Sequence, residues 1–462
     1  MPLQKNQVLT LRVERLSSDG SGVAHSPDGE TVFIPGAAPG DEARVRIVKD
    51  CKRYAFGILD EVLTPSPDRI PVDCAVAGPC GGCSLRHLDY AAELRAKQEN
   101  VADAFARIGG LDVPVLPIVG SPEVNRYRNK VQFPVGVDKS GKPCIGFYAG
   151  RTHRIVPCPD CRLQPGVLNE IGNALCAFFA EKGIQPYSEE TGRGLVRHIF
   201  LRRGAHSGQI MVCLVCTRAK LPSAEELCTR LKAQFAEITT ILLNVNAKNT
   251  NVILGTETHT LYGQGYIEDT LCGVPVQLGP LSFYQVNTLA AEQLYGIAAQ
   301  YAQLTPDDLL LDLYCGMGTI GLSMAAHCRE LIGVEIVPEA IESAKANAAR
   351  MGADVAAKSR FFCADAGQAA TRLAAEGLHP DIVMLDPPRK GCDEATLSAV
   401  VRMSPRRVVY VSCNPATAAR DAAWLEQNGY RAEKVQPVDL FPRTRHCEAV
   451  LLLTKLHVDR HI

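Results

Sequence analysis

Hydrophobic and polar positions alternate in short runs through the first sixty residues of the chain. Runs such as Thr31–Pro35 and Ala43–Val48 are separated by Gly, Pro and Asp turns, and no helical period appears. This pattern predicts a series of short strands, which is typical of a small closed barrel. We therefore expect a β-barrel of the OB type over residues 1–63.

A basic cluster interleaved with aromatic residues follows residues 43–48. Its members are Lys49, Lys52, Arg53, Tyr54 and Phe56. Lysine and arginine suit an RNA backbone, and aromatic rings suit a stacked base. A solvated hairpin with core aromatics would show the same residues, so the sequence leaves both interpretations open.

The pattern changes after a proline-rich linker at residues 65–71. Residues 89–108 carry apolar side chains at helical spacing and stop at a Gly-Gly pair. Strands are predicted at residues 127–133, 144–148, 195–203, 210–216 and 240–246. Four arginines recur along the strand predicted at residues 195–203 and just before it: Arg193, Arg197, Arg202 and Arg203. Either a charged outer face of the strand or a contact with RNA would explain them. We expect a central α+β domain, acting as a substrate platform, over residues 72–278.

From residue 279 to residue 462 the rhythm becomes strand, helix, strand. The apolar run Leu309–Tyr314 leads into the glycine turn Cys315–Gly321, and later apolar runs end at polar residues. Those ends are Glu335, Asp365, Asp386 and Cys413. The alternation predicts an α/β doubly wound, Rossmann-like parallel sheet, in which the carboxyl ends of the strands face the ligand crevice.

Composition narrows the class of protein. The chain has 462 residues, 46% of them hydrophobic, with 49 basic and 50 acidic residues, so only local patches can indicate a nucleic-acid partner. The first fifteen residues have no signal-peptide pattern, and the uncharged stretch 271–291 is broken by Gly, Pro, Gln and Asn. We expect a cytoplasmic monomer that makes no membrane contact. Its 18 cysteines, in a reducing compartment, favour metal binding or catalysis over disulfides.

Five cysteines outside the parallel sheet form a candidate metal site. They are Cys74, Cys80, Cys83, Cys158 and Cys161. Two CxxC pairs would bind zinc tetrahedrally and leave Cys74 unused. The first three cysteines plus one of the later pair would instead hold an iron–sulfur cluster. Spacing alone does not decide between these two sites.

The glycine turn has two possible partners. Gly316-x-Gly318-x-x-Gly321, with Glu335 about 20 residues later, matches the dinucleotide fingerprint and would suit a nicotinamide-dependent oxidoreductase. S-adenosylmethionine also offers a ribose to Glu335, and Asp365 could bind its adenine amine. The sequence Asp386-Pro-Pro-Arg389 has no place in hydride transfer, whereas methyltransferases that act on bases use such a strand end to hold the target.

Five motifs in order resemble those of the RNA (uracil-5-)-methyltransferase family. They are Phe283-Tyr-Gln-Val-Asn287, Asp312-Leu-Tyr-Cys-Gly-Met-Gly318, Asp386-Pro-Pro-Arg-Lys-Gly391, Val411-Ser-Cys-Asn-Pro415 and Phe441-Pro-x-Thr-x-His-x-Glu448. Asp19–Ala24, Phe33–Gly36 and Pro39–Asp41 resemble the TRAM module of RNA-modifying enzymes. The barrel and the cysteines extend the resemblance to the branch that modifies 23S ribosomal RNA.

The resemblance implies a role for each matching residue. Cys413 would be the nucleophile and Glu448 the base, although a surface charge before the final strand would also explain Glu448. S-adenosylmethionine would lie against Gln285, Tyr314, Glu335, Asp365 and Asp386. A [4Fe-4S] cluster would take Cys74, Cys80, Cys83 and Cys161, with Cys158 as the alternative fourth ligand. Apart from the resemblance, a thiolate needs a nearby positive group or hydrogen bond, for which Arg389 and His446 are candidates. A phosphate contact and a structural cap would explain these two residues equally well.

We therefore expect S-adenosylmethionine-dependent methylation of carbon 5 of a uridine through a covalent cysteine adduct. The expected substrate is 23S rRNA. Three alternatives are the same chemistry on tRNA, a nicotinamide-dependent oxidoreductase, and an RNA-binding protein without activity.

Overall fold

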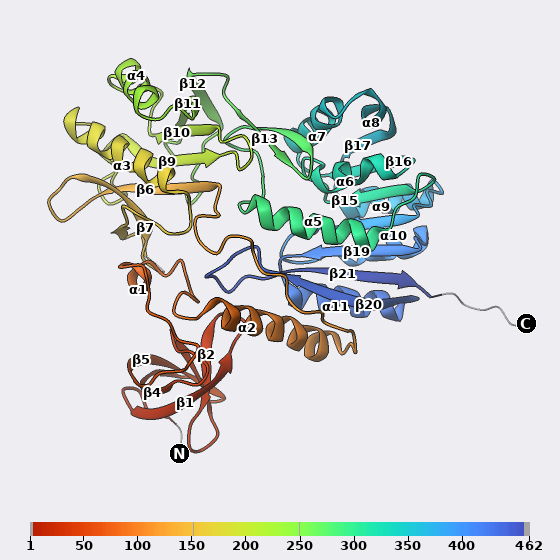
Figure 1. Ribbon diagram of the computed structural model, residues 1–462, viewed down its shortest axis with the longest axis horizontal. Helices are drawn as coiled ribbons and strands as arrows, with labels where there is room; N and C mark the ends of the chain where they lie inside the picture. Colours follow the sequence, from red (N-terminus) through yellow and green to blue (C-terminus); the bar gives the residue numbers. More distant parts are fainter. Residues whose placement is uncertain (1–2, 151, 249, 457–462) are drawn as a thin grey trace, which may run out of the picture. The chain divides into compact units, whose positions relative to one another are not determined.

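The structure is a computed structural model that describes residues 3–150, 152–248 and 250–456 (Figure 1). Contacts along the chain divide it into two compact units. The first unit holds residues 1–124, 387–392 and 410–462, and the second holds residues 125–386 and 393–409. One boundary lies between Asp386 and Pro387, so the predicted site residues are distributed over both units.

The first unit begins with a closed five-stranded barrel, as the alternating pattern predicted. The strands are β1 (Val8–Leu16), β2 (Ser21–His25), β3 (Thr31–Pro35), β4 (Glu42–Asp50) and β5 (Tyr54–Thr64), hydrogen-bonded in the order β1-β2-β3-β5-β4. Along β4, buried Ala43, Val45 and Ile47 alternate with exposed residues, as a half-buried strand requires. A Cβ at Gly57 would come within 2.3 Å of Val45 Cγ1, so the closed barrel needs glycine there.

After the barrel, the first unit contains the short helix α1 (Ala77–Cys80) and the longer helix α2 (Tyr90–Asp103). Asp89 caps α2 by accepting a hydrogen bond from Ala92 N at 2.8 Å. The helix continues as a π-helical turn, Ala104–Gly109, and ends at Gly110 with a φ of 63°. The predicted helix and its glycine stop are therefore confirmed.

The second unit contains a seven-stranded sheet in the order β12-β11-β10-β9-β6-β7-β8. The strands are β6 (Lys130–Val137), β7 (Pro143–Tyr148), β8 (Ile155–Pro157), β9 (Val196–Arg203), β10 (Ile210–Cys216), β11 (Ile238–Val245) and β12 (Glu257–Tyr262). Helices α3 (Gly166–Glu181) and α4 (Ala224–Gln234) pack on it and share one hydrophobic core with its strands (Figure 1). The strand predicted at residues 127–133 begins three residues later than expected.

Two arginines of β9 are buried, whereas one interpretation of the sequence placed them on a solvent-exposed charged face. Arg197 is 6% exposed and Arg202 is 1% exposed. Arg202 donates from Nη1 to Gly279 O and from Nη2 to Ser282 O, both at 2.8 Å. Main-chain carbonyls from later in the chain accept from both terminal nitrogens of the guanidinium, whereas the buried Nε has no hydrogen-bond partner. This arginine therefore ties β9 to a later segment and is not a solvated charge.

The parallel sheet follows a two-stranded ribbon, β13 (Ile267–Leu271) with β14 (Val274–Leu278), and helix α5 (Thr288–Ala302). In the second unit the strands run in the order β17-β16-β15-β18 and continue into the first half of β19. They are β15 (Leu309–Leu313), β16 (Glu330–Glu335), β17 (Ser359–Cys363), β18 (Ile382–Leu385) and β19 (Arg407–Ser412). The chain order reverses between β15 and β18, which makes this the topological switch point where such sheets bind ligands.

Helices connect the strands as a doubly wound fold requires. They are α6 (Thr319–Met324), the 3-10 turn η2 (Ala325–His327), α7 (Pro338–Arg350), α8 (Ala353–Lys358), α9 (Ala366–Ala375) and α10 (Glu394–Met403). In the first unit the second half of β19 leads to α11 (Pro415–Gln427), and β20 (Tyr430–Val438) pairs antiparallel with β21 (Glu448–Lys455). The predicted fold class is confirmed. In the part of the chain that the structure describes, none of the helices is both long and apolar enough to pass through a bilayer.

Candidate active site

The glycine turn after β15 is fixed by a carboxylate at the end of β16. Glu335 Oε2 accepts a hydrogen bond from Gly316 N at 3.1 Å, and Oε1 accepts from Ile336 N at 2.8 Å and Val337 N at 3.0 Å. Tyr314, before the turn, has a φ of 65°, a strained value for a side chain of this size. Ile336 and Val337 are exposed although apolar, so the end of β16 presents an acceptor beside an open hydrophobic surface.

Two carboxyl groups lie behind this turn, Asp312, which is buried, and Asp386, which is half-buried. Asp312, on β15, accepts from Gly321 N at 3.0 Å through Oδ2. Burial, opposed by that hydrogen bond and assisted by the charges of Asp386 and Glu335, raises the pKa of Asp312 to about 8. Burial also raises the pKa of Asp386, at the end of β18, to about 7. Burial therefore favours the neutral form of both carboxyl groups in the empty fold, and a cationic ligand at this end of the sheet would favour their charged forms.

The loop that carries Gln285 is held from the central sheet. Asn129 N donates to Val286 O at 2.8 Å, and Asn129 Nδ2 donates to Gln285 O at 2.8 Å and Thr288 Oγ1 at 3.0 Å. Arg202 fixes the turn that precedes the same loop. The backbone of Gln285 is thereby set by residues from more than 80 positions earlier in the chain.

Tyr295, on α5, connects several of these groups and was not identified from the sequence. Its hydroxyl hydrogen-bonds with the side chains of Gln285 and Thr319 and lies within electrostatic reach of Asp386. Burial, and then the carboxylate, raise the pKa of Tyr295 well above its usual value, so the group stays a neutral hydrogen-bond donor. Tyr295 is one of 13 tyrosines at an ordinary helical position, and nothing local in the sequence distinguishes it.

Asp365 and Tyr314 follow the ends of β17 and β15, the two strands on either side of β16 in the second unit. Asp365 caps α9 by accepting from Gln368 N at 3.1 Å, and Ala364 N, just before it, donates to Glu335 O at 2.9 Å. The Tyr314 hydroxyl lies 3.3 Å from Thr396 Oγ1. The second unit thus brings Gln285, Glu335 and Asp386 into one electrostatic group around Tyr295 and Asp312, with Asp365 and Tyr314 at its strand ends.

In the first unit, Cys413 follows the last residue of β19 and is half-buried. Asn414 Nδ2 donates to Arg389 O at 2.9 Å, and Asn414 Oδ1 caps α11 by accepting from Ala416 N at 3.2 Å. The segment after Asp386 is therefore fastened to the residue next to the thiol. Arg389 makes this contact through its carbonyl, and its guanidinium is exposed.

Asp421, buried on α11, completes this fastening. Its Oδ2 accepts from the Tyr410 hydroxyl at 2.6 Å and from Cys392 N at 2.8 Å. Arg420 Nη2 donates to Lys390 O at 3.0 Å. Strand β19, helix α11 and residues 387–392 are consequently one rigid element around Cys413.

Glu448 is the first residue of β21, paired with Val438 of β20, and is 5% exposed. The alternative interpretation of Glu448 as a surface charge is therefore wrong, because the side chain is buried within the first unit. His446 packs edge-to-face on Phe441, with ring centroids 6.1 Å apart, so it is part of a structured approach to Glu448.

The candidate metal ligands are thiols without disulfides. Cys74, Cys80 and Cys83 are half-buried in the first unit, and Cys161 is half-buried in the second. Cys158 is 3% exposed and belongs to the core. Among the described residues, no three His, Cys, Asp or Glu side chains converge as metal ligands would. The donor set, four cysteine thiols, suits an iron–sulfur cluster chemically.

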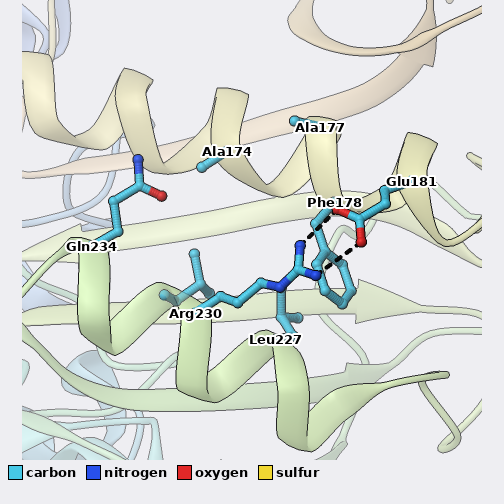
Figure 2. A pocket seen from close by; sticks show the side chains of 8 residues that line it. Ala174, Ala177, Phe178, Glu181, Leu227, Arg230 and Gln234 are labelled. Carbon is cyan, nitrogen blue, oxygen red and sulfur yellow. Dashed lines mark hydrogen bonds and ion pairs between the residues drawn. The ribbon is translucent and has the colours of Figure 1, made fainter.

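A cavity of about 290 Å³ lies between helices α3 and α4 of the second unit (Figure 2). Its lining comes from α3 and α4, with Phe178 and Leu227 at its side. Arg230 and Glu181, which both line it, are joined by hydrogen bonds from Arg230 Nη1 to Glu181 Oε2 at 2.6 Å and from Nη2 to Oε1 at 2.9 Å. None of the predicted site residues lines this cavity.

Comparisons with known proteins agree with the geometry of the strand ends. The sequence profile of the tRNA (uracil-5-)-methyltransferase family matches residues 204–456, and that of the TRAM domain matches residues 2–59. A protein of Halalkalibacterium halodurans described as an uncharacterized RNA methyltransferase is 43% identical over 98% of both chains. A similarly described protein of Oceanobacillus iheyensis is 41% identical over 98% of both chains.

A solved structure matches the whole architecture. The tRNA (uracil-54, C5)-methyltransferase of Pyrococcus abyssi, crystallised with S-adenosyl-L-homocysteine, superposes with a TM-score of 0.77 at 27% identity. The match covers 96% of this chain and 100% of that one. Family and fold together exclude the oxidoreductase interpretation of the glycine turn and identify S-adenosylmethionine as the cofactor. The chain belongs to the tRNA (uracil-5-)-methyltransferase family, whose members methylate carbon 5 of uracil in RNA.

Proposed function

We propose that this protein methylates carbon 5 of a uridine in 23S ribosomal RNA, with Cys413 as the nucleophile and Glu448 as the base. The main support is the half-buried thiol of Cys413 at the carboxyl end of a parallel strand, in an element made rigid by Asn414 and Asp421. A structural cysteine of the sheet would be expected inside the strand and fully buried.

The chemistry explains why both residues are needed. Carbon 5 of uracil is a poor nucleophile, and addition of the Cys413 thiolate to carbon 6 turns the ring into an enolate with electron density on carbon 5. S-adenosylmethionine supplies the methyl group that carbon 5 takes up. Glu448 then accepts the proton from carbon 5, the carbon 6–sulfur bond breaks, and the electron pair of that bond returns to Cys413 as thiolate.

The cofactor pocket in this proposal is the group of strand ends in the second unit. Glu335 would bind the ribose diol, since its carboxylate retains acceptor capacity beside the three main-chain donors. Asp365 would bind the adenine amine. Gln285, Tyr314 and Asp386 would lie around the remainder of the cofactor, with the negative charge of Asp386 favourable to the sulfonium.

RNA would also contact the barrel. Phe33, Tyr54 and Phe56 form a cluster with ring centroids 5.6 to 5.8 Å apart, and Tyr54 is 40% exposed. Lys52 and Arg53 are exposed next to it. We assign RNA capture to residues 1–63, a substrate platform to residues 72–278 and catalysis to residues 279–462. The contacts of the platform and barrel would offset the few kcal/mol needed to flip the target base.

The same chemistry on tRNA is the second candidate. The Pyrococcus abyssi enzyme acts on a tRNA uracil, and the part of this chain outside the match is smaller than the barrel. A barrel on this fold is thus compatible with either RNA. The cysteine-rich segment favours 23S rRNA through the resemblance described above.

A trapping experiment tests the covalent mechanism. With S-adenosylmethionine and RNA that contains 5-fluorouridine, we expect a covalent protein–RNA complex that survives denaturation, because fluorine cannot leave as a proton does. Cys413→Ala should form none. Cys144→Ala, which removes a thiol of similar exposure on β7, should trap as much RNA as the parent protein. A complex that persists in Cys413→Ala would contradict the mechanism.

We further propose that Cys74, Cys80, Cys83 and Cys161 bind a [4Fe-4S] cluster, a structural staple. Cys161 is preferred because its side chain is half-buried, whereas that of Cys158 is buried in the core. Anaerobically purified protein should contain about four irons per chain. Cys161→Ser should lose this iron and Cys158→Ser should retain it. One zinc per chain, or equal loss in both variants, would contradict the assignment.

A further inference from the structure

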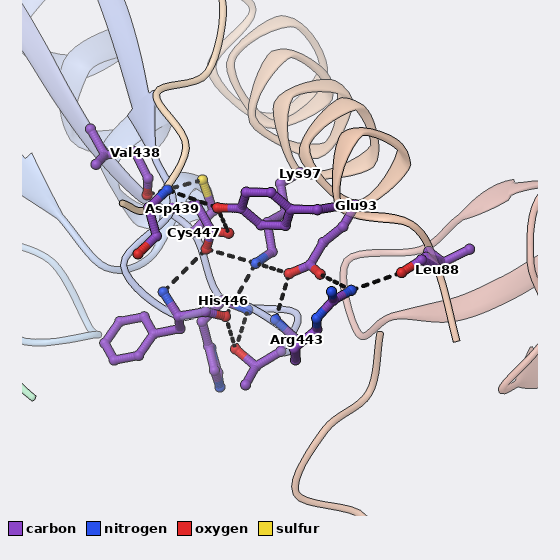
Figure 3. Close-up of polar contacts among 12 residues, drawn as sticks. Leu88, Glu93, Lys97, Val438, Asp439, Arg443, His446 and Cys447 are labelled. Carbon is purple, nitrogen blue, oxygen red and sulfur yellow. Dashed lines mark hydrogen bonds and ion pairs between the residues drawn. The ribbon is translucent and has the colours of Figure 1, made fainter. Parts of the chain in front are cut away.

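A buried ion network in the first unit joins helix α2 to the residues between β20 and β21 (Figure 3). Lys97 Nζ donates to Glu93 Oε1 at 2.7 Å and to Asp439 Oδ1 at 2.8 Å. Lys97 is 1% exposed, and Glu93 and Asp439 are 0% exposed. The Tyr90 hydroxyl donates to Asp439 Oδ2 at 2.9 Å. Two carboxylates and a lysine are thus removed from water together, 342 residues apart along the chain.

The same network holds the main chain of residues Asp439–Cys447, which we call the approach segment. Lys97 Nζ donates to Phe441 O at 3.2 Å, and Phe441 N donates to Asp439 Oδ1 at 3.1 Å. Arg443 N donates to Glu93 Oε1 at 2.7 Å, and Arg443 Nη1 donates to Leu88 O at 2.8 Å. Helix α2 and the residue just before its cap therefore fasten the segment at two separate positions.

The approach segment leads directly into Glu448. Arg443 has a φ of 68°, so the segment takes a path that its own side chains do not favour. The pairing of Val438 with Glu448 fixes the backbone on both sides of the segment. Between them, Glu93, Lys97 and Asp439 hold the main chain at Phe441 and Arg443. Cys447, the residue before Glu448, lies within electrostatic reach of Lys97, Asp439 and Glu448.

A core of apolar residues could join a helix to a loop at lower cost. Burying charged groups is expensive, and replacing a buried ion network by packed hydrophobic residues is often neutral or stabilising. Such a network has one advantage, since its hydrogen bonds are satisfied in a single geometry. Its presence beside the predicted base indicates that this geometry matters more than stability.

We propose that Lys97 and Asp439 are positioning residues that orient the approach segment so that Glu448 can reach the proton on carbon 5. This inference rests on the proposed function and concerns only the second half of the reaction. Addition of Cys413 and transfer of the methyl group precede proton removal. Loosening the network therefore slows elimination while leaving methyl transfer nearly unchanged.

Two isotopic labels separate the two steps. The probe is unmethylated total RNA from cells lacking the gene, labelled with tritium at carbon 5 of its pyrimidines, together with methyl-¹⁴C S-adenosylmethionine. Carbon-14 in RNA reports methyl transfer, and tritium in water reports proton loss. For Asp439→Asn we expect methyl transfer within threefold of the parent protein, tritium release slowed at least tenfold, and accumulation of ¹⁴C-labelled covalent adduct. Tyr90→Phe removes the hydroxyl that donates to Asp439 and accepts from Ser121 N, and it should show the same split at about threefold.

The controls distinguish positioning from stability. Asp308→Asn removes a carboxylate of comparable burial that pairs with Arg406 at 2.7 Å in the second unit, and its ratio of the two rates should equal that of the parent protein. Equal slowing of both steps in Asp439→Asn and Tyr90→Phe, or no slowing in either, would overturn the positioning role. A parent protein that forms no adduct, or a Glu448→Gln variant that releases tritium at the parent rate, would overturn the proposed function itself.

Discussion

Asp386 and Asp312 are carboxyl groups that would be fully charged at neutral pH in water. Burial raises the pKa of Asp386 to about 7 and, with the charges of Asp386 and Glu335, that of Asp312 to about 8. Because both values lie above those of the unfolded chain, each group stabilises the empty fold at low pH and loses that contribution as pH rises through its folded pKa. A cationic ligand shifts the protonation equilibrium of these groups the other way, since it favours the charged carboxylate over the neutral carboxyl.

This reversal predicts how cofactor affinity depends on pH. If Asp386 faces the sulfonium, S-adenosylmethionine binds the deprotonated form, and its affinity should rise about tenfold from pH 6 to pH 8 and then level off. Titration calorimetry across this range measures the curve. S-adenosylhomocysteine, which lacks the sulfonium, should show a smaller slope, and Asp386→Asn should bind both ligands with little pH dependence. A full slope retained in Asp386→Asn would place the titrating group elsewhere.

At the scale of helices and strands, the sequence predicted the elements that have a clear local pattern of hydrophobic and polar residues. Apolar runs that end in polar residues located β16 and β18 with Glu335 and Asp386 at their ends, and alternation located the barrel. The predicted start of β6 was three residues too early, because Tyr127 and Arg128 precede the strand in the structure. Short strands have no strong signal at their edges.

The sequence could not predict which hydrogen bonds polar side chains make with elements that are distant along the chain. Arg202 has the pattern of a solvated charge, yet carbonyls from Gly279 and Ser282 bury it. Tyr295, Asn129 and Lys97 look like ordinary helix or strand residues, because their importance comes from partners up to 344 positions away. Periodicity reports which face of an element is buried, but it does not report the polar groups that meet there.

At the scale of the whole molecule, the open question is which RNA these parts select. The barrel presents Tyr54 beside exposed Lys52 and Arg53, a combination that would suit single-stranded RNA without strong sequence preference. Selection must then come from the shape of the RNA that can reach both the barrel and the catalytic sheet. An enzyme that acts on tRNA has the same overall fold, so architecture alone does not choose.

Mapping 5-methyluridine in cells that lack this chain makes the choice. We expect one or more 5-methyluridines to disappear from 23S rRNA while those of tRNA remain, because the cysteine-rich segment resembles that of the ribosomal branch. Complementation with the parent gene should restore them, and Cys413→Ala should not. Replacing Phe33, Tyr54 and Phe56 by alanine should weaken methylation through KM more than through kcat, since the rings would capture RNA and take no part in the chemistry. Loss of 5-methyluridine from tRNA alone would assign the protein to the tRNA substrate and show that the cysteines do not mark the ribosomal one.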